Sequence, residues 1–322
     1  CAYLLIPLSV LYVKYFPQFG VQYAWDGGKS WAGVALEKNG LGHLCLISVF
    51  LLLWSLITSK GEIRSGRDKV RLVVDIMIMV MALWLLKGAE NAYSATSIGA
   101  LAVGVSISLL LRLRIAKRNL GNIGSIILAI IGIVVVMQMT FNPIEILVTA
   151  LGRDTTFTGR TPLWNTLIDF GLQKPILGYG YGGFWLEERI QIILERTNLL
   201  FRIGHNGYLE VFVEGGVVGI VLLAGLIISS LLKIQKTLLS NYDYGVFRRC
   251  LLLMIVLGTL PESSFARPQD FLWFVFLLIV ISRPDKNHVP TGGKSRGLPP
   301  LTGSKPYTTV GLNGPGQSLR PV

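Results

Sequence analysis

The stretch GYLEVFVEGGVVGIVLLAGLIISSLL, residues 207–232, decides the fold class of this 322-residue chain. After Glu214 it holds no charged side chain as far as Leu232. A helix of about 20 apolar residues crosses the hydrocarbon core of a bilayer, so the stretch predicts a membrane span. The whole chain agrees, because 52% of its residues are hydrophobic and only 15% are charged, against about a quarter charged in soluble domains.

Further apolar segments lie on both sides of this one, at 2–16, 41–59, 72–86, 97–111, 122–141, 247–261 and 271–282. Together they predict an all-α protein, a polytopic transmembrane helix bundle with about eight spans. The last two segments could instead form a re-entrant pair. Because the chain begins with Cys1, we expect the N-terminal part of the natural protein to be missing.

The net charge of +12 is distributed in a way that predicts topology. Lysines and arginines gather in alternate connections, at 60–71, 112–118, 233–249 and beyond 283. The positive-inside rule places these connections in the cytoplasm. The opposite side then receives residues 17–40, 87–96, 142–206 and 262–270. A basic chain could also bind nucleic acid, but this alternation of charge argues against that class.

Two regions are expected along the chain. Residues 1–283 form the transmembrane domain, which includes a large outward-facing loop, 142–206. Residues 284–322 are rich in Gly, Pro, Ser and Thr and lack apolar periodicity, so we predict a disordered cytoplasmic tail.

The outer loop is expected to be largely helical. Thr161 and Pro162 form a good helix start, and Gly171 can end that helix. One face of it would carry Leu163, Trp164, Leu167 and Ile168. Residues 178–183 (GYGYGG) predict a turn, and residues 184–200 predict a second amphipathic helix. The aromatic residues around the turn could stack on sugar rings or lie at the membrane interface.

Several polar residues lie where this loop meets the span. His205 is the only histidine of the loop, and Asn206 is a plausible N-cap. Glu210 and Glu214 share a helix face near the membrane, where ionisable groups are functional candidates, although they could simply favour the helix N-terminus. Arg160 beside the first loop helix could equally be a solvated surface charge. The scattered cysteines and histidines show no metal-ligand spacing, and no cofactor is expected.

Six short stretches of the chain are informative as a set: GRTPLW at 159–164, KPILGYG at 174–180, HNGYLE at 205–210, EGGVVG at 214–219, WAGVALEKNGLG at 31–42 and SATS at 94–97. Together they resemble the O-antigen ligase/polymerase family of bacterial membrane glycosyltransferases. The resemblance covers roughly residues 25–282. It implies transfer of a glycan from an undecaprenyl-pyrophosphate carrier to a hydroxyl of a glycan or lipid A–core acceptor. That reaction takes place on the periplasmic face of the bacterial inner membrane and needs no nucleotide sugar.

The resemblance also implies roles for individual residues. His205 is the expected catalytic residue, near the acceptor hydroxyl. The expected substrate-binding residues are Arg160, Lys38, Asn39, Asn206 and Glu210. Family members often carry an arginine where this chain has Ala32, so Lys29 or Lys38 would supply that charge. A leaving pyrophosphate requires fixed positive charge, which arginine provides bidentately, and it does not require a metal.

Two activities remain open within this class. One is polymerisation of repeat units into O-antigen or exopolysaccharide, which we slightly favour, and the other is ligation of glycan to lipid A–core. The non-enzymatic alternative is a transporter. A transporter predicts ionisable residues at mid-membrane, whereas those of this chain gather at the outer boundary.

Overall fold

The computed structural model describes residues 1–23, 28–35, 37–58, 66–89, 94–112 and 160–282, and within them the chain forms ten helices and one two-stranded sheet. The expected span at 122–141, the first part of the outer loop at 142–159 and the tail at 284–322 lie outside the described residues. The remaining apolar segments all form helices, as the sequence predicted.

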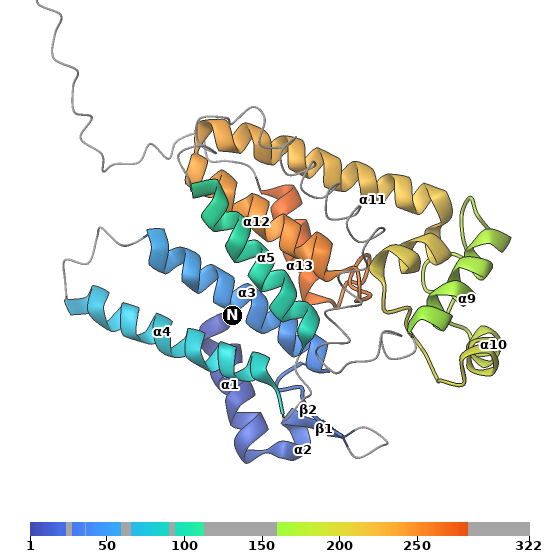
Figure 1. Ribbon diagram of the computed structural model, residues 1–322, viewed down its shortest axis with the longest axis horizontal. Coiled ribbons are helices and arrows are strands. Elements are labelled where there is room, and N and C mark those ends of the chain that lie inside the picture. Colours follow the sequence, from blue (N-terminus) through green and yellow to red (C-terminus); the bar gives the residue numbers. More distant parts are fainter. Residues whose placement is uncertain (24–27, 36, 59–65, 90–93, 113–159, 283–322) are drawn as a thin grey trace, which may run out of the picture. The chain divides into compact units, whose positions relative to one another are not determined.

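The N-terminal half packs around α3 (Lys38–Thr58). Helix α3 contacts α1 (Ala2–Tyr15), α4 (Gly66–Lys87) and α5 (Ala95–Arg112), as Figure 1 shows. Apolar side chains fill the space between α1, α3 and α4, among them Ile6, Cys45, Ala82 and Leu85. These helices form because each carries a long apolar run whose burial stabilises it.

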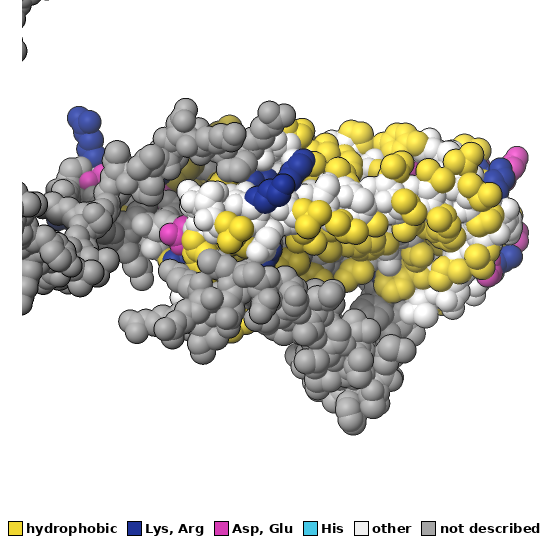
Figure 2. Space-filling model, turned by 90° about the horizontal axis from the view of Figure 1, so that it is seen from above, with side chains coloured by type: hydrophobic (Ala, Val, Ile, Leu, Met, Phe, Trp, Pro, Cys, Tyr) yellow, Lys and Arg dark blue, Asp and Glu magenta, His cyan; other side chains and the backbone are white. Residues whose placement is uncertain are grey.

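The C-terminal half consists of α11 (Gly207–Ser240), α12 (Tyr242–Gly258) and α13 (Phe271–Ile281). Helix α12 lies between α5 and α11, and a second apolar cluster joins them through Phe50, Leu238, Met254 and Phe276. Hydrophobic side chains cover much of the coloured part of the face in Figure 2. That distribution suits a helix bundle in lipid.

Among the described residues, three helices are long and apolar enough to cross a membrane: α3, α5 and α11. Helices α1 and α13 are apolar but shorter. The all-α membrane class is therefore supported, whereas the count of eight spans stays a prediction.

A small β-hairpin departs from the all-α prediction. Helix α2 (Pro17–Gly20) leads into β1 (Val21–Tyr23), which pairs antiparallel with β2 (Lys29–Trp31). Trp31 packs on Trp84 of α4 with ring centroids 4.3 Å apart. Strands of three residues are too short for a period-two pattern to reveal them in the sequence.

The outer loop contains α9 (Arg160–Gln173) and α10 (Glu187–Thr197), close to the two predicted helices. Two details of the prediction were wrong. Gly171 does not end α9, because the helix continues to Gln173. A side chain at Gly171 would overlap the Phe212 ring of α11, so this glycine instead permits close helix packing. Ile168 is 40% exposed, whereas Leu163 and Leu167 are buried.

Helix α11 is broken at Gly216, whose φ of 62° and ψ of −157° are essentially restricted to glycine. The loop between α9 and α10 fills the break. Tyr179 N donates to Val213 O at 2.9 Å, and Gly180 N donates to Glu214 O at 2.8 Å. Beyond the break, Val217 N donates to Pro175 O at 2.8 Å. The loop thus satisfies backbone groups that an unbroken helix would pair internally.

Replacing Gly216 with alanine should therefore destabilise the protein. The backbone conformation alone should cost about 1–3 kcal/mol. The new side chain would also overlap the carbonyl group of Ile176. The matched control is Gly215→Ala, because no atom lies within 4 Å of a side chain added at Gly215. Thermal unfolding in detergent should show a clearly lower melting temperature for Gly216→Ala but not for Gly215→Ala. Equal melting temperatures for the two variants would contradict a strained break at Gly216.

Candidate functional site

A buried carboxylate, Glu210, joins four chain segments at the start of α11. It is 3% exposed. One oxygen accepts the indole N–H of Trp185 at 2.9 Å and lies 3.0 Å from a guanidinium nitrogen of Arg267. The other oxygen accepts the backbone N–H of Gly204 and the hydroxyl of Ser263, the latter at 3.0 Å. A carboxylate so fully paired fixes its neighbours in position.

A second buried carboxylate, Glu262, holds the N-terminal half against the outer loop. It accepts a hydrogen bond from Asn39 Nδ2 of α3 at 2.8 Å, and it lies 3.6 Å from Arg160 of α9. Arg160 also donates to Pro261 O at 2.6 Å. Burial raises the pKa of the Glu262 carboxyl to about 7, although the charge of Arg160 and the Asn39 hydrogen bond favour its ionised form.

His205 lies near enough to Arg160 and Arg267 for both charges to act on its imidazole. Burial lowers the pKa of its imidazole to about 4, and the charges of Arg160 and Arg267 act in the same direction. The ring is therefore neutral near pH 7. Its Nδ1 atom is buried, with no hydrogen-bond partner among the residues that the structure describes. The backbone of His205 has a φ of +47°, and such conformations often mark functional sites.

The structure brings most of the expected site residues together. Arg160, His205 and Glu210 lie in one connected group, and Asn39 reaches it through Glu262. Asn206 lies beside them and is the N-cap of α11, as predicted. Its side chain accepts hydrogen bonds from Tyr208 N and Leu209 N.

The two lysines considered as substitutes for the arginine that family members often carry at position 32 are both exposed. Lys38 is exposed at the start of α3, and its charge favours the ionised form of Glu262. Lys29 is exposed in β2.

Sequence reasoning missed three members of the site. Glu262 and Arg267 come from the connection between α12 and α13, and Trp185 comes from the turn before α10. The signal for the first two was available, since 261–270 (PESSFARPQD) places charged residues between two apolar segments. Trp185 was expected to stack on sugar or to lie at the interface, and its neighbour Phe184 is fully buried against Phe170.

A cavity of about 710 Å³ opens beside Glu262 and Arg267, and it is called the polar cavity here because charged and amide side chains contribute to its lining. It lies between the start of α3 and the connection from α12 to α13, and its polar lining includes Glu37, His43, Gln269 and Asp270. Carboxylates, amides and a guanidinium provide donors and acceptors for a polyhydroxyl ligand.

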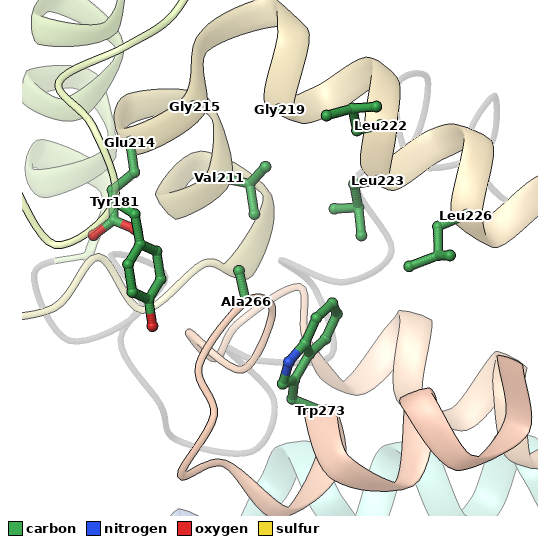
Figure 3. A pocket seen from close by; sticks show the side chains of 10 residues that line it. All are labelled: Tyr181, Val211, Glu214, Gly215, Gly219, Leu222, Leu223, Leu226, Ala266 and Trp273. Atoms are coloured by element: carbon green, nitrogen blue, oxygen red, sulfur yellow. The ribbon is translucent and has the colours of Figure 1, made fainter. Parts of the chain in front are cut away.

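An apolar cavity of about 440 Å³ lies between α11 and α13. Figure 3 shows Trp273 of α13 pointing toward Leu223 and Leu226 of α11, with Tyr181 and Glu214 at the other end. Ala266 lines this apolar cavity, whereas the next residue, Arg267, lines the polar cavity. Ala266, whose backbone has a left-handed φ of +57°, therefore lies where the linings of the two cavities meet.

No group of three or more His, Cys, Asp and Glu side chains in the described ranges is arranged to hold a metal ion. The described site consists of two arginines, two buried carboxylates and one neutral histidine, and its members Glu262 and Arg267 line the polar cavity. Fold and site together define a helical membrane protein with a charged centre at one end of its bundle.

Comparison with known proteins supports a specific family. Residues 80–224 match the family model described as O-antigen ligase. The exopolysaccharide production protein ExoQ of Rhizobium meliloti (strain 1021) is 26% identical over 227 residues, which cover 67% of this chain and 49% of that protein. The chain thus spans about half the length of this curated relative. These matches agree with the resemblance to the O-antigen ligase/polymerase family that the sequence motifs indicated.

Proposed function

We propose that this protein transfers or polymerises undecaprenyl-pyrophosphate-linked oligosaccharide units on the periplasmic face of the bacterial inner membrane, in O-antigen or exopolysaccharide biosynthesis. The observation that carries the proposal is the position of His205, a neutral imidazole beside two arginines. A proton acceptor beside fixed positive charge is the arrangement that transfer from a pyrophosphate donor requires.

In the proposed reaction, the acceptor hydroxyl oxygen bonds to the anomeric carbon of the donor glycan. The bond from that carbon to the pyrophosphate oxygen breaks, and the electron pair leaves with undecaprenyl pyrophosphate. His205 takes the proton of the hydroxyl. Arg160 and Arg267 stabilise the departing pyrophosphate, because guanidinium groups match phosphate oxygens bidentately. The pKa of Glu262, near 7, leaves Arg160 incompletely neutralised at neutral pH.

The two cavities suit the two ends of such a reaction. The apolar cavity between α11 and α13 fits the isoprenoid part of the donor near its pyrophosphate. The polar cavity beside Glu262 fits the acceptor glycan. Arg267 and Ala266, which border one cavity each, lie where donor and acceptor would meet.

Polymerisation and ligation to lipid A–core are both compatible with this site. The relative named for exopolysaccharide production favours polymerisation. A transporter is less consistent with the site, since the buried ionisable cluster lies at the N-terminal end of α11.

Surface glycans of a deletion strain separate the two enzymatic activities. Loss of long chains with a single repeat retained on lipid A–core would indicate a polymerase. Accumulation of lipid-linked polymer would indicate a ligase. Unchanged surface and lipid-linked glycans would contradict both.

Arg160→Ala should strongly reduce use of the lipid-linked donor by purified protein, because the variant removes fixed positive charge from the pyrophosphate. Arg160→Lys keeps the charge but loses the bidentate geometry, so its rate should be intermediate. The matched control is Arg196→Ala, which removes an arginine from an exposed ion pair with Asp169 on the same outer loop. Full activity of Arg160→Ala at normal protein level would show that Arg160 is a surface charge only.

Transfer should also survive chelation. The proposed leaving group is stabilised by arginines, so purified protein treated with EDTA should retain its rate. The measurement is glycan transfer before and after chelation, with magnesium or manganese added back. A strict requirement for the added ion would contradict the proposed mechanism.

A further inference from the structure

Two arginines lie at the end of the bundle opposite Glu210, where α5 and α11 end and α12 begins (Figure 1). Arg112 is the last residue of α5, and Arg249 is near the start of α12. The Tyr242 hydroxyl donates to Leu111 O, which ties these helix ends together. The charges of both arginines act on the same neighbours, Tyr242 and Cys250.

The guanidinium groups are held in place but leave donors without acceptors among the residues that the structure describes. Arg112 stacks over the Trp54 ring at 4.6 Å, and its Nε and Nη2 atoms are buried without a hydrogen-bond partner in those ranges. Arg249 is 3% exposed, and its Nη2 donates to Gln235 Oε1 at 2.5 Å, whereas its Nε and Nη1 have no partner within the described part of the chain. The ion pairs between described residues lie elsewhere.

The neighbouring Arg248 shows how a structural arginine at this end is used. It donates to the backbone oxygens of Ile279 and Ser282, at 2.6 and 3.0 Å, and to the Thr237 hydroxyl at 3.2 Å. These bonds satisfy the C-terminal end of α13. Within the described ranges, Arg112 and Arg249 make no comparable set of bonds, so capping of a described helix does not account for them.

Buried guanidinium donors without acceptors are strongly unfavourable, and an anion supplied from outside the chain would satisfy them. Nε and Nη2 of Arg112 share one edge of the guanidinium plane, the edge that binds two oxygens of a phosphate at once. We propose that Arg112 and Arg249 form a binding site for a phosphate group, and that the group belongs to an anionic membrane lipid.

A lipid is favoured over free phosphate by the surroundings of the site. Leu109 and Leu110 of α5 and Leu239 of α11 are large apolar side chains that the protein leaves exposed near these helix ends. Acyl chains can cover them while the headgroup phosphate reaches the arginines. Basic pockets between spans are a recognised mode of anionic lipid binding. The phosphate site lies near the C-terminal end of the 34-residue helix α11, whereas the proposed catalytic centre lies near its N-terminal end. The lipid site therefore does not depend on the proposed function.

The test measures thermal unfolding of the full chain in neutral detergent. Separate samples receive cardiolipin, phosphatidylcholine or inorganic phosphate. Cardiolipin should raise the melting temperature of the wild type more than phosphatidylcholine does. Most of that rise should disappear in Arg112→Gln and in Arg249→Gln. Lys236→Gln is the matched control, since it removes one exposed charge near the end of α11 and should keep the rise.

An equal rise in wild type and in both arginine variants would overturn the site. A rise produced equally by inorganic phosphate, and lost in the variants, would support the anion site but overturn the lipid as its source. Because Arg249→Gln could fail to fold, Arg112→Lys is a second variant that keeps the charge and loses the two-donor edge, and it should lose most of the rise. Native mass spectrometry of the wild type should detect one retained anionic lipid; its absence would also overturn the proposal.

Discussion

Replacing Glu210 with alanine is expected to destabilise the folded protein by about 3–5 kcal/mol, the typical result of removing one partner of a buried ion pair. The change would leave the Arg267 guanidinium, the Trp185 indole N–H and the Gly204 amide without their acceptor. Since these groups come from separate segments, we expect the outer loop and the α12–α13 connection to lose their common anchor. The measurement is the thermal unfolding midpoint in detergent.

Two further variants make the Glu210 prediction specific. Glu210→Gln keeps an acceptor oxygen and the side-chain shape, so it should fall between wild type and alanine. Glu214→Ala removes a half-buried carboxylate four residues along the same helix, at the edge of the apolar cavity, and should cost about 1 kcal/mol. A Glu210→Ala protein that melts like Glu214→Ala would contradict the anchoring role.

The second large effect concerns catalysis. Replacing His205 with asparagine should lower the transfer rate by about 10²- to 10⁴-fold, the usual contribution of a general base. Asparagine suits this position because it tolerates the left-handed backbone conformation of His205 better than most residues do. The fold should therefore persist, and donor binding, measured separately, should remain. The control is Arg202→Gln, an exposed change in the same loop.

The pH dependence of the wild type provides an independent test. Since the pKa of His205 lies at about 4, the ring accepts a proton at neutral pH and loses that ability as the pH falls through about 4. The fall in rate with acid should be absent from the residual activity of His205→Asn. Transfer by His205→Asn at nearly the wild-type rate would show that His205 is not the catalytic group. A lower rate that is fully explained by a lower protein level would also contradict the proposed role.

The parts of the fold that could be predicted are those determined by local sequence. Long apolar runs form helices because a helix satisfies its own backbone groups in a bilayer, where no water is present to pair with them. Asn206 caps α11 because its side chain sits beside two unpaired backbone N–H groups. Local sequence did not reveal the role of Gly171. This glycine makes room for Phe212, and Phe212 belongs to another helix.

The site was only partly predictable for the same reason. His205, Arg160 and Glu210 could be identified from short motifs and from their position near the membrane. The partners that determine their chemistry come from distant parts of the chain. Glu262 lies 223 residues from Asn39, and Arg267 reaches Glu210 across 57 residues of chain. Only tertiary packing brings these charges together, so the burial that makes His205 neutral could not be inferred from spacing.

The break at Gly216 determines which parts of the chain fold and open together. Before the break, Val213 O and Glu214 O accept backbone hydrogen bonds from the turn between α9 and α10, and just beyond it Val217 N and Val218 N donate to the same turn. Residues farther along α11 pack on α12. Native-state hydrogen exchange should accordingly group residues 207–218 with the outer loop and separate them from residues 219–240. Glu210 then belongs to a cooperative unit that can open and reclose while the remainder of the helix stays folded in the membrane.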